Sequence, residues 1–465
     1  MTQDDNKWRI IISFSILFGW VMSLPYEGPV LFALADMKGI NGDLVNTVTV
    51  FSHFAGLFLS QFFVKDVKRA KQVGQLGLGA VLMSSMLLPF THSREWFLII
   101  PFDAFLAGVV ITAFAYLIFK GISHDERRPI AAMLLIFGNL ELILAHILAN
   151  NIGAMPAFAV ITLLLGYGWF QFSRIDIRDM EKSAVKKRLT LVEPERRHPF
   201  VPMRQYWIFF LFIFIITINS GIMFSVIYPY FESFPLLTSL YTNVPYIGAI
   251  YVLSKLVKTN KFQYLYIGLA MWGVTFILFA LTGQTAMAFV VICTVMLAAC
   301  GIFDLFWWHT MITNFDSVEN PAGLFGTGLA INVFGVWSGS LLGMHLMSMG
   351  VDKMTLSLVG IGIVFLCLVI VYPLNRRLSE FLENNEFVFV IASKDPEKAE
   401  DKIDEVKAVL TRREFEVFEL LVSGMTDAEI SKSLYISPHT TKSHNRNIYK
   451  KLEVANRIEL YEKYI

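Results

Sequence analysis

The sequence predicts an all-α protein with two unlike parts: a polytopic transmembrane helix bundle over residues 1–374 and a small four-helix domain over residues 408–465. Hydrophobic residues make up 55% of the 465 residues and charged residues only 17%, whereas soluble domains contain about 25% charged residues. The charged residues are sparse before residue 375 and dense after it. This division indicates a lipid-embedded part followed by a water-soluble part.

The first part contains about twelve apolar runs, each close to the roughly 20 residues that a membrane-spanning helix needs. Six runs form a first half over about 9–173, and six form a second half over about 205–374, with the polar stretch 174–204 between them. The runs lie near 9–33, 43–64, 72–90, 96–119, 129–150, 154–173, 205–228, 236–257, 262–282, 284–312, 321–349 and 354–374. The run 321–349 is rich in glycine, so it could break or tilt.

The loops between these runs predict the orientation of the bundle. Lys and Arg gather in alternate loops, and cytoplasmic loops carry the excess of these residues. The basic loops contain Lys65, Lys68, Arg69, Lys71, Arg127, Arg128, Lys186, Lys187, Arg188, Arg196, Arg197, Lys255, Lys258 and Lys261, whereas the other loops hold little beyond Lys38, Arg94 and Lys353. We therefore expect a multi-pass protein of the inner membrane with both termini in the cytoplasm.

Six helices, a long basic linker and six more helices resemble the architecture of the major facilitator superfamily of transporters over about residues 9–374. In that family, the loop between the second and third helices carries a Gly, an Asp-Arg pair and a second Gly before basic residues. This chain has Gly56, Asp66, Lys68, Arg69 and Lys71, but no glycine follows Asp66. The resemblance implies the fold, and it leaves transport as an open alternative.

The C-terminal segment contains capping residues that predict the ends of four short helices. Thr411 with Glu414 predicts a capping box, and so does Thr426 with Glu429. Gly424 predicts the end of the first helix. A third helix is expected to begin after Ser437, because Pro438 follows it at the first helical position. Asn456 with Glu459 predicts the cap of the fourth helix.

The third of these helices would present Lys442, Arg446 and Lys450 on one face. A helix pair with a tight turn and a basic second helix is the arrangement that inserts a helix into the DNA major groove. The segment 408–465 closely resembles the LuxR-type helix-turn-helix. The matching residues are Leu410, Thr411, Arg413, Glu414, Glu416, Val417, Gly424, Glu429, Ile430, Leu434, Ile436, Ser437, Thr440, Lys442, His444, Ile448, Leu452, Val454 and Arg457.

Three residues depart from the LuxR pattern. Ser431 stands for a small Ala, Thr441 for a packing Val, and Glu453 for a Gly that turns the chain. A threonine on a helix can bond a backbone carbonyl one turn back, which would satisfy the buried hydroxyl of Thr441. A residue other than Gly at 453 is expected to loosen the turn before the fourth helix.

The resemblance implies a role for individual residues of the third helix. Lys442, Ser443 and Arg446 would face base edges, whereas His439, Thr440 and Lys450 would lie nearer phosphates. The partner would be double-stranded promoter DNA, bound by a homodimer formed through this domain. The alternative is that the basic residues form an ordinary solvated helix face.

Polar residues within membrane spans are costly and therefore mark candidate functional sites. Asp304 and Trp308 share one helix face and Trp307 flanks it, which suggests a pocket for an amine or a small aromatic molecule. The candidate pocket residues are Asp304, Trp307, Trp308, His309, Glu141, Asp103, Glu27 and Asn332; His53, His146, Asn219 and His345 are further polar residues in the runs. The alternative is that such Trp and His residues anchor the spans at the membrane interface.

Between the two parts, residues 375–407 predict a cytoplasmic linker. Its first residues, 375–383, can prolong the last membrane helix, the segment EFVFVIA is too short to span, and KDPEKAED predicts a hinge. No phosphate loop, HExxH motif or nucleophile with its base is present, and Cys293, Cys300 and Cys367 lie within apolar runs. We therefore expect no enzyme, cofactor or metal site.

These observations favour a membrane-bound one-component transcription regulator, in which the bundle senses a small molecule or a membrane signal and the helix-turn-helix binds DNA. The alternative is a secondary transporter with a fused regulatory DNA-binding domain.

Overall fold

The computed structural model describes residues 3–26, 28–178, 180, 201–234, 237–238, 241, 243–256, 263–318, 320–393, 406–407, 409–422, 425, 427–454 and 459–460. All regular elements in these ranges are helices. The chain divides into two compact units, Met1–Leu374 and Asn375–Ile465.

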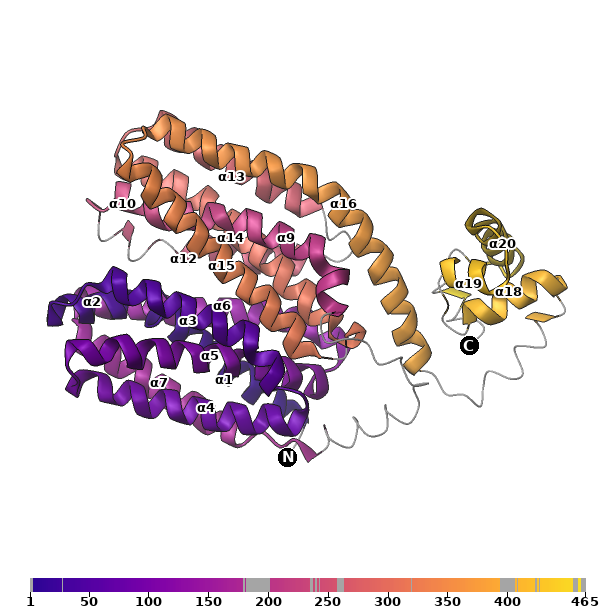
Figure 1. Cartoon of the computed structure of the whole chain (residues 1–465), viewed down its shortest axis with the longest axis horizontal. Helices are drawn as coiled ribbons and strands as arrows, with labels where there is room; N and C mark the ends of the chain where they lie inside the picture. The colour runs from indigo at the N-terminus through magenta and orange to yellow at the C-terminus, as the bar shows by residue number, and fades with distance from the viewer. Residues whose placement is uncertain are drawn as a thin grey trace. The chain divides into compact units, whose positions relative to one another are not determined.

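The first half of the membrane unit is a group of packed helices, drawn in indigo and purple in Figure 1. They are α1 (Gln3–Ser23), α2 (Pro29–Lys38), α3 (Gly42–Phe63), α4 (Val67–Leu87), α5 (Ser93–Gly121), α6 (His124–Asn151) and α7 (Ala154–Ser173), with the short η1 (Leu88–Phe90) after α4. Helix α5 packs against α3 and α4, while α1 packs against α6 and α7.

The second half follows in magenta to orange. Its helices are α9 (Val201–Ile222), η2 (Met223–Ile227), α10 (Tyr228–Tyr230), α12 (Asn243–Leu256), α13 (Gln263–Leu281), α14 (Ala286–Thr313), η3 (Asn314–Ser317), α15 (Pro321–Ser348) and α16 (Lys353–Ser393). Helix α9 packs on α15, and α14 packs on α12 and α13. The two halves meet where α15 contacts α3 and α5, and where α12 and α14 contact α6.

Nine helices in the described ranges are long and apolar enough to cross a membrane. They correspond to nine of the twelve predicted runs. Three runs are not among the nine, although each contains helix. The run 9–33 overlaps α1 and α2, the run 43–64 overlaps α3, and the run 236–257 contains α12. The coarse prediction of an all-α protein with many membrane-length helices is therefore confirmed.

Two predicted runs have different helix boundaries in the structure. The run 9–33 is broken between Ser23 and Pro29, where Gly28 has an extended backbone (φ −82, ψ 144) and Pro29 begins α2. A proline disfavours helical backbone at the preceding residue, which explains the break. The run 236–257 forms a helix of only 14 residues from Asn243.

The glycine-rich run 321–349 neither breaks nor divides, because α15 is one helix of 28 residues. Its glycines allow α9 to approach closely. A Cβ at Gly339 would lie 2.1 Å from the carbonyl oxygen of Ile218, and a Cβ at Gly335 would lie 2.1 Å from Thr217 Oγ1. Small residues are common where membrane helices pack backbone to backbone.

The C-terminal unit contains α18 (Arg412–Val422), α19 (Asp427–Ser433) and α20 (Pro438–Lys451). The predicted capping box is present, since Glu414 Oε2 accepts from the Thr411 N–H at 2.9 Å and Thr411 Oγ1 accepts from the Glu414 N–H at 3.4 Å. The buried core is Val406, Leu410, Val417, Phe418, Leu421, Ile430, Ile448, Leu452, Val454 and Leu460. The predicted positions Gly424, Thr426 and Asn456 lie outside the described residues.

The last membrane helix is longer than predicted, because α16 continues past residue 383 to Ser393. Helix α16 therefore includes the EFVFVIA segment of the predicted linker. The predicted hinge KDPEKAED begins at the end of this helix, and its residues from 394 to 401 lie outside the described ranges.

Candidate functional site

Helix α20 has one buried and one exposed face. Its buried face carries Thr441, Asn445 and Ile448. The opposite face is open to solvent and contains most of the predicted DNA-contacting residues. Lys442, Ser443, Arg446, His439 and Lys450 are exposed, and Thr440 is partly buried.

The first turn of α20 is fixed by Ser437. Its side chain accepts from the Thr440 N–H at 3.0 Å, and its hydroxyl lies 2.7 Å from Thr440 Oγ1. Pro438 holds the first helical position, as predicted from the sequence. In the described part of the chain, Lys442, Arg446 and Lys450 form no ion pair, so their charges are available to an anionic partner.

Polar contacts lock α20 against α19. Asn445 Nδ2 donates to Asp427 Oδ1 at 2.7 Å. The hydroxyls of Ser431 and Thr441 lie 2.7 Å apart, and Ser431 Oγ also donates to the carbonyl of Asp427 at 2.5 Å. Ser431 and Thr441, which both depart from the LuxR pattern, therefore form a hydrogen bond with each other, so neither buried hydroxyl is left without a partner.

The end of α20 is tied to α18 by an ion pair. Lys451 Nζ lies 2.7 Å from Glu414 Oε2, and the Glu414 side chain is only 7% exposed. Burial alone would raise the pKa of Glu414, but the hydrogen bonds from Lys451 and Thr411 outweigh it and lower this pKa to about 2. After α20, Glu453 has a left-handed backbone with φ 55, at the position where the family carries glycine.

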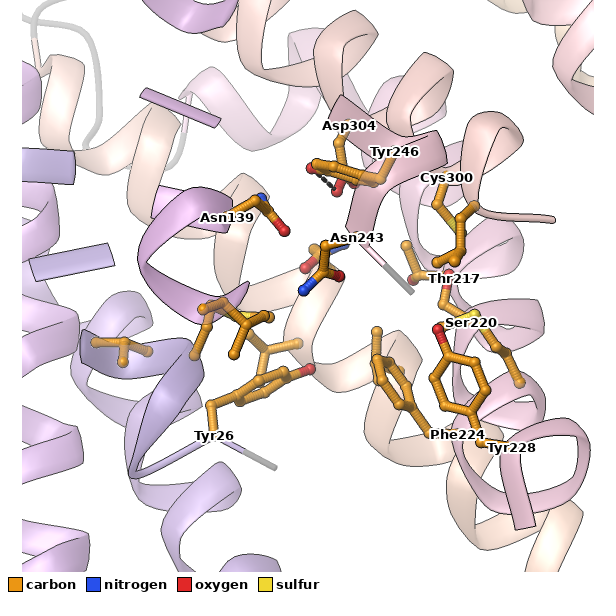
Figure 2. Close-up of a pocket in the computed structure, with 18 of the residues that line it drawn as sticks. Tyr26, Asn139, Thr217, Ser220, Phe224, Tyr228, Asn243, Tyr246, Cys300 and Asp304 are labelled. Atoms are coloured by element: carbon orange, nitrogen blue, oxygen red, sulfur yellow. Dashed lines mark hydrogen bonds between the residues drawn. The ribbon is translucent and has the colours of Figure 1, made fainter. Parts of the chain in front are cut away.

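The membrane unit contains a cavity of about 660 Å³ between its two halves. The first half contributes residues of α1, α2, α3, α5 and α6, and the second half contributes residues of α9, η2, α10 and α12 to α15. Figure 2 shows Tyr26 and Asn139 facing Thr217, Ser220 and Tyr228 across this space.

One carboxylate in the cavity is held by a neighbouring helix. Tyr246 on α12 donates its hydroxyl to Asp304 Oδ2 on α14 at 2.6 Å (Figure 2). Trp307 and Trp308 follow on the same helix and also line the cavity. Asn332 lines it from α15. The structure thus brings together four of the eight candidate pocket residues.

Three other candidates are buried elsewhere. His309 does not line the cavity. It stands five residues after Asp304 on α14, so its side chain projects about 140° away from that of Asp304 around the helix axis. Asp103 on α5 accepts hydrogen bonds from Ser84 and, at 3.1 Å, from Ser85 on α4. Glu141 lies against α1, where a Cβ at Gly19 would be 2.6 Å from Glu141 Cβ. Glu27 lies outside the described residues.

Several lining residues were not among the candidates. Tyr246 gives no signal in the sequence, because it is one aromatic residue in an apolar run. Asn139 and Asn243 are polar residues inside predicted runs. The polarity criterion that selected Asn332 could therefore have found both.

An aromatic cluster lies beside Asp304, on the side toward the N-terminus of α1. The Trp308 ring is 5.2 Å from the Phe325 ring, 5.3 Å from Phe18 and 5.8 Å from Phe14, measured between centroids. Phe14 and Phe325 are fully buried. Of these four rings, Phe18 and Trp308 line the cavity, whereas Phe14 and Phe325 do not.

The two units are similar to different known proteins. Residues 408–463 match the family model of the bacterial regulatory proteins of the luxR type. Over 51 residues the chain is 49% identical to the spore germination protein GerE of Bacillus subtilis. This aligned segment covers 11% of this chain and 69% of GerE. The chain is 44% identical over 50 residues to the transcriptional regulator MalT of Vibrio campbellii, but spans only 6% of that protein's length.

The membrane unit matches a solved structure in fold. The crystal structure of the human organic anion transporter MFSD10 (TETRAN) aligns with a TM-score of 0.60 at 10% sequence identity, over 80% of this chain and 100% of that one. The membrane unit therefore resembles a major facilitator transporter in fold, and the chain is a multi-pass membrane protein.

Proposed function

The chain belongs, through its C-terminal domain, to the LuxR family of bacterial regulatory proteins, and on that premise we propose that it is a membrane-bound one-component transcription regulator. The membrane bundle receives a small-molecule signal, the C-terminal domain binds promoter DNA, and neither part is catalytic. The observation that carries this proposal is that one chain contains both an exposed cationic α20 and, inside a membrane bundle, a cavity whose mainly apolar lining includes several polar side chains.

The exposed face of α20 suits the major groove. Arg446 and Lys442 are one turn apart and unpaired among the described residues, so they can reach base edges without breaking an existing contact. Ser443 is also exposed and lies beside Arg446 on the helix surface. His439, Thr440 and Lys450 lie at the two ends of the helix, where they would contact phosphates.

The membrane unit would cross the inner membrane twelve times, with both termini in the cytoplasm. The alternation of basic loops supports this orientation. Helices α1, α3 and α12 would supply the three crossings beyond the nine helices of clear membrane character. A cytoplasmic C-terminus is required if α20 is to reach the chromosome.

Helix α16 offers a route between the two functions. It begins in the membrane unit at Lys353 and continues as one helix to Ser393. Two copies of the DNA-binding domain held near one membrane site would pair at high effective concentration. A ligand would change this pairing only if it binds two states of the bundle with different affinities.

Selection of DNA by the full chain tests the regulator. The chain in lipid nanodiscs is offered a random pool of duplex DNA, and the bound sequences are compared for wild type and Arg446→Ala. Removal of a base-reading arginine should weaken binding by about 1–3 kcal/mol and relax base choice at one position. Arg412→Ala is the matched control, because Arg412 is an exposed arginine on α18. Unchanged base preference in Arg446→Ala would remove the assigned role.

The alternative function is a secondary transporter with a fused regulatory domain. The likeness in fold to a transporter and the cavity between the two halves favour it. Uptake by proteoliposomes separates the two functions, because a ligand that binds without accumulating excludes the transporter.

A further inference from the structure

The chemistry of the cavity points to a specific class of ligand. We infer that it binds a small organic cation carrying an aromatic ring, with the ammonium group at Asp304 and the ring among the aromatic side chains. This inference rests on the proposed function, in which the cavity receives the signal.

The charge of the lining favours a cation. Asp36, Glu232 and Asp304 contribute carboxylates, and none of the described lining residues is Lys or Arg. A buried charge is stable only when a group of opposite charge or several hydrogen bonds compensate it. An organic anion would find no permanent positive charge here, whereas a cation would find a carboxylate inside the cavity.

Two histidines also line the cavity, and each carries a positive charge only when it is protonated. His53 is 4% exposed, and its Nδ1 donates to the carbonyl oxygen of Ala104 at 2.9 Å. That bond engages one ring nitrogen and fixes the ring in place. His146 lines the cavity from α6. Among the described lining residues, Asp304 is the carboxyl group on the same helix as Trp307 and Trp308.

Asp304 is oriented to accept a further donor. Its Oδ2 already accepts the Tyr246 hydroxyl at 2.6 Å. Its Oδ1 accepts no hydrogen bond from any described residue. An ammonium group has several N–H donors, and a charge-assisted hydrogen bond to Oδ1 is among the strong contacts available to it.

The aromatic residues supply the second half of the site. Trp307 and Trp308 stand three and four residues after Asp304, so both lie near it on α14. Tyr228 and Phe224 face the cavity from α10 and η2 (Figure 2). Indole and phenol rings attract cations at their faces and stack on aromatic ligands.

The size and entrance of the cavity agree with this class. A volume of about 660 Å³ falls within the range of small-molecule sites, roughly 300–1,000 Å³. Asp36 and Glu232 are exposed lining residues, so the cavity reaches the surface beside them. Carboxylates at an entrance raise the local concentration of cations and repel anions.

A binding comparison with three matched compounds tests the inference. The full chain in nanodiscs is titrated with phenethylamine, neutral 2-phenylethanol and anionic 3-phenylpropionate, with tryptophan fluorescence as the signal. We expect saturable binding of the amine, with affinity at least about tenfold higher than for the other two. Equal or stronger binding of the anion, or no binding of the amine, would overturn the inference.

Variants locate the site. Asp304→Asn should weaken amine binding about tenfold or more and leave 2-phenylethanol binding unchanged, and Tyr246→Phe should weaken amine binding less. The matched control is Asp103→Asn, which changes a buried carboxylate that does not line the cavity. Unchanged amine affinity in Asp304→Asn would contradict the site.

A DNA measurement on the same samples distinguishes this inference from the proposed function. If the amine fails to bind but the full chain still selects DNA through Arg446, the ligand class is wrong and the regulator stands. If the amine binds at Asp304 but no DNA sequence is selected, the cavity assignment holds and the regulator falls.

Discussion

The hydroxyls of Ser431 and Thr441 lie 2.7 Å apart in the buried contact between α19 and α20. Thr441 is fully buried, and Ser431 is 5% exposed. At these two positions the LuxR pattern has alanine and valine, so the chain replaces an apolar contact with a hydrogen-bonded one. The pair helps to fix the angle at which α20 presents its exposed face.

The pair should be energetically coupled. Ser431→Ala leaves the Thr441 hydroxyl with only the Ser437 carbonyl at 3.4 Å, so it should destabilise the domain by about 1 kcal/mol. Ser431→Ala with Thr441→Val restores an apolar contact and should lie within about 0.5 kcal/mol of wild type. Hydrogen exchange of the α20 amides in the full chain measures the stability of the two single variants and of the double variant. Simple addition of the two single effects would contradict the coupling.

The ion pair of Glu414 and Lys451 should make the C-terminal domain acid-sensitive. The pKa of Glu414 is lowered to about 2 in the folded state, so its contribution is complete above its ordinary value of 4.5 and is lost as the pH falls toward 2. Hydrogen exchange corrected for intrinsic rates should show falling stability over that range. Glu414→Gln should flatten this dependence, whereas Glu419→Gln, an exposed change on the same helix, should keep it. An unchanged slope in Glu414→Gln would exclude the ion pair as its source.

Glu453 carries backbone strain that glycine would relieve. Its φ of 55 lies in the left-handed region, which costs a residue other than glycine about 1 kcal/mol. Glu453→Gly should therefore stabilise the turn after α20 by about 0.5–1 kcal/mol. Glu453→Ala retains the strain and serves as the control. Equal stability of the Gly and Ala variants, by the same exchange measurement, would show that the strain is absent.

The contact between α9 and α15 should not tolerate a side chain at Gly339. Its Cβ would lie 2.1 Å from the backbone carbonyl oxygen of Ile218, so the helices must separate. Gly339→Ala should destabilise the bundle by about 2 kcal/mol or more, seen as a lower melting temperature in detergent. A Cβ at Gly362 on α16 meets no atom within 4 Å, so Gly362→Ala should melt at the wild-type temperature or slightly above it. Equal melting of the two variants would contradict the close packing.

Much of the fold follows from the sequence, because a membrane helix must satisfy its backbone within one segment. Each apolar run therefore contains helix. The break before Pro29 and the start of α12 at Asn243 were missed, because the apolar runs continue across both of these helix boundaries. The C-terminal caps at Thr411 and Ser437 were found because they are local patterns of four residues.

The cavity was predicted only in part, for a physical reason. Periodicity along α14 groups Asp304 with Trp307 and Trp308, but it does not tell which helix faces them. The partner of Asp304 is Tyr246, 58 residues away on another helix. Glu141 and Asp103 were selected for polarity alone, and each faces a neighbouring helix of its own half.

Capture of chromatin with the tagged full chain in its native membrane tests the central claim most directly. Wild type should enrich a defined set of promoters, Arg412→Ala should enrich the same set, and Arg446→Ala should lose about tenfold or more of the signal, consistent with the loss of a base contact. Equal enrichment by Arg446→Ala, or no promoter enrichment by wild type, would contradict a membrane-bound regulator that reads DNA through α20.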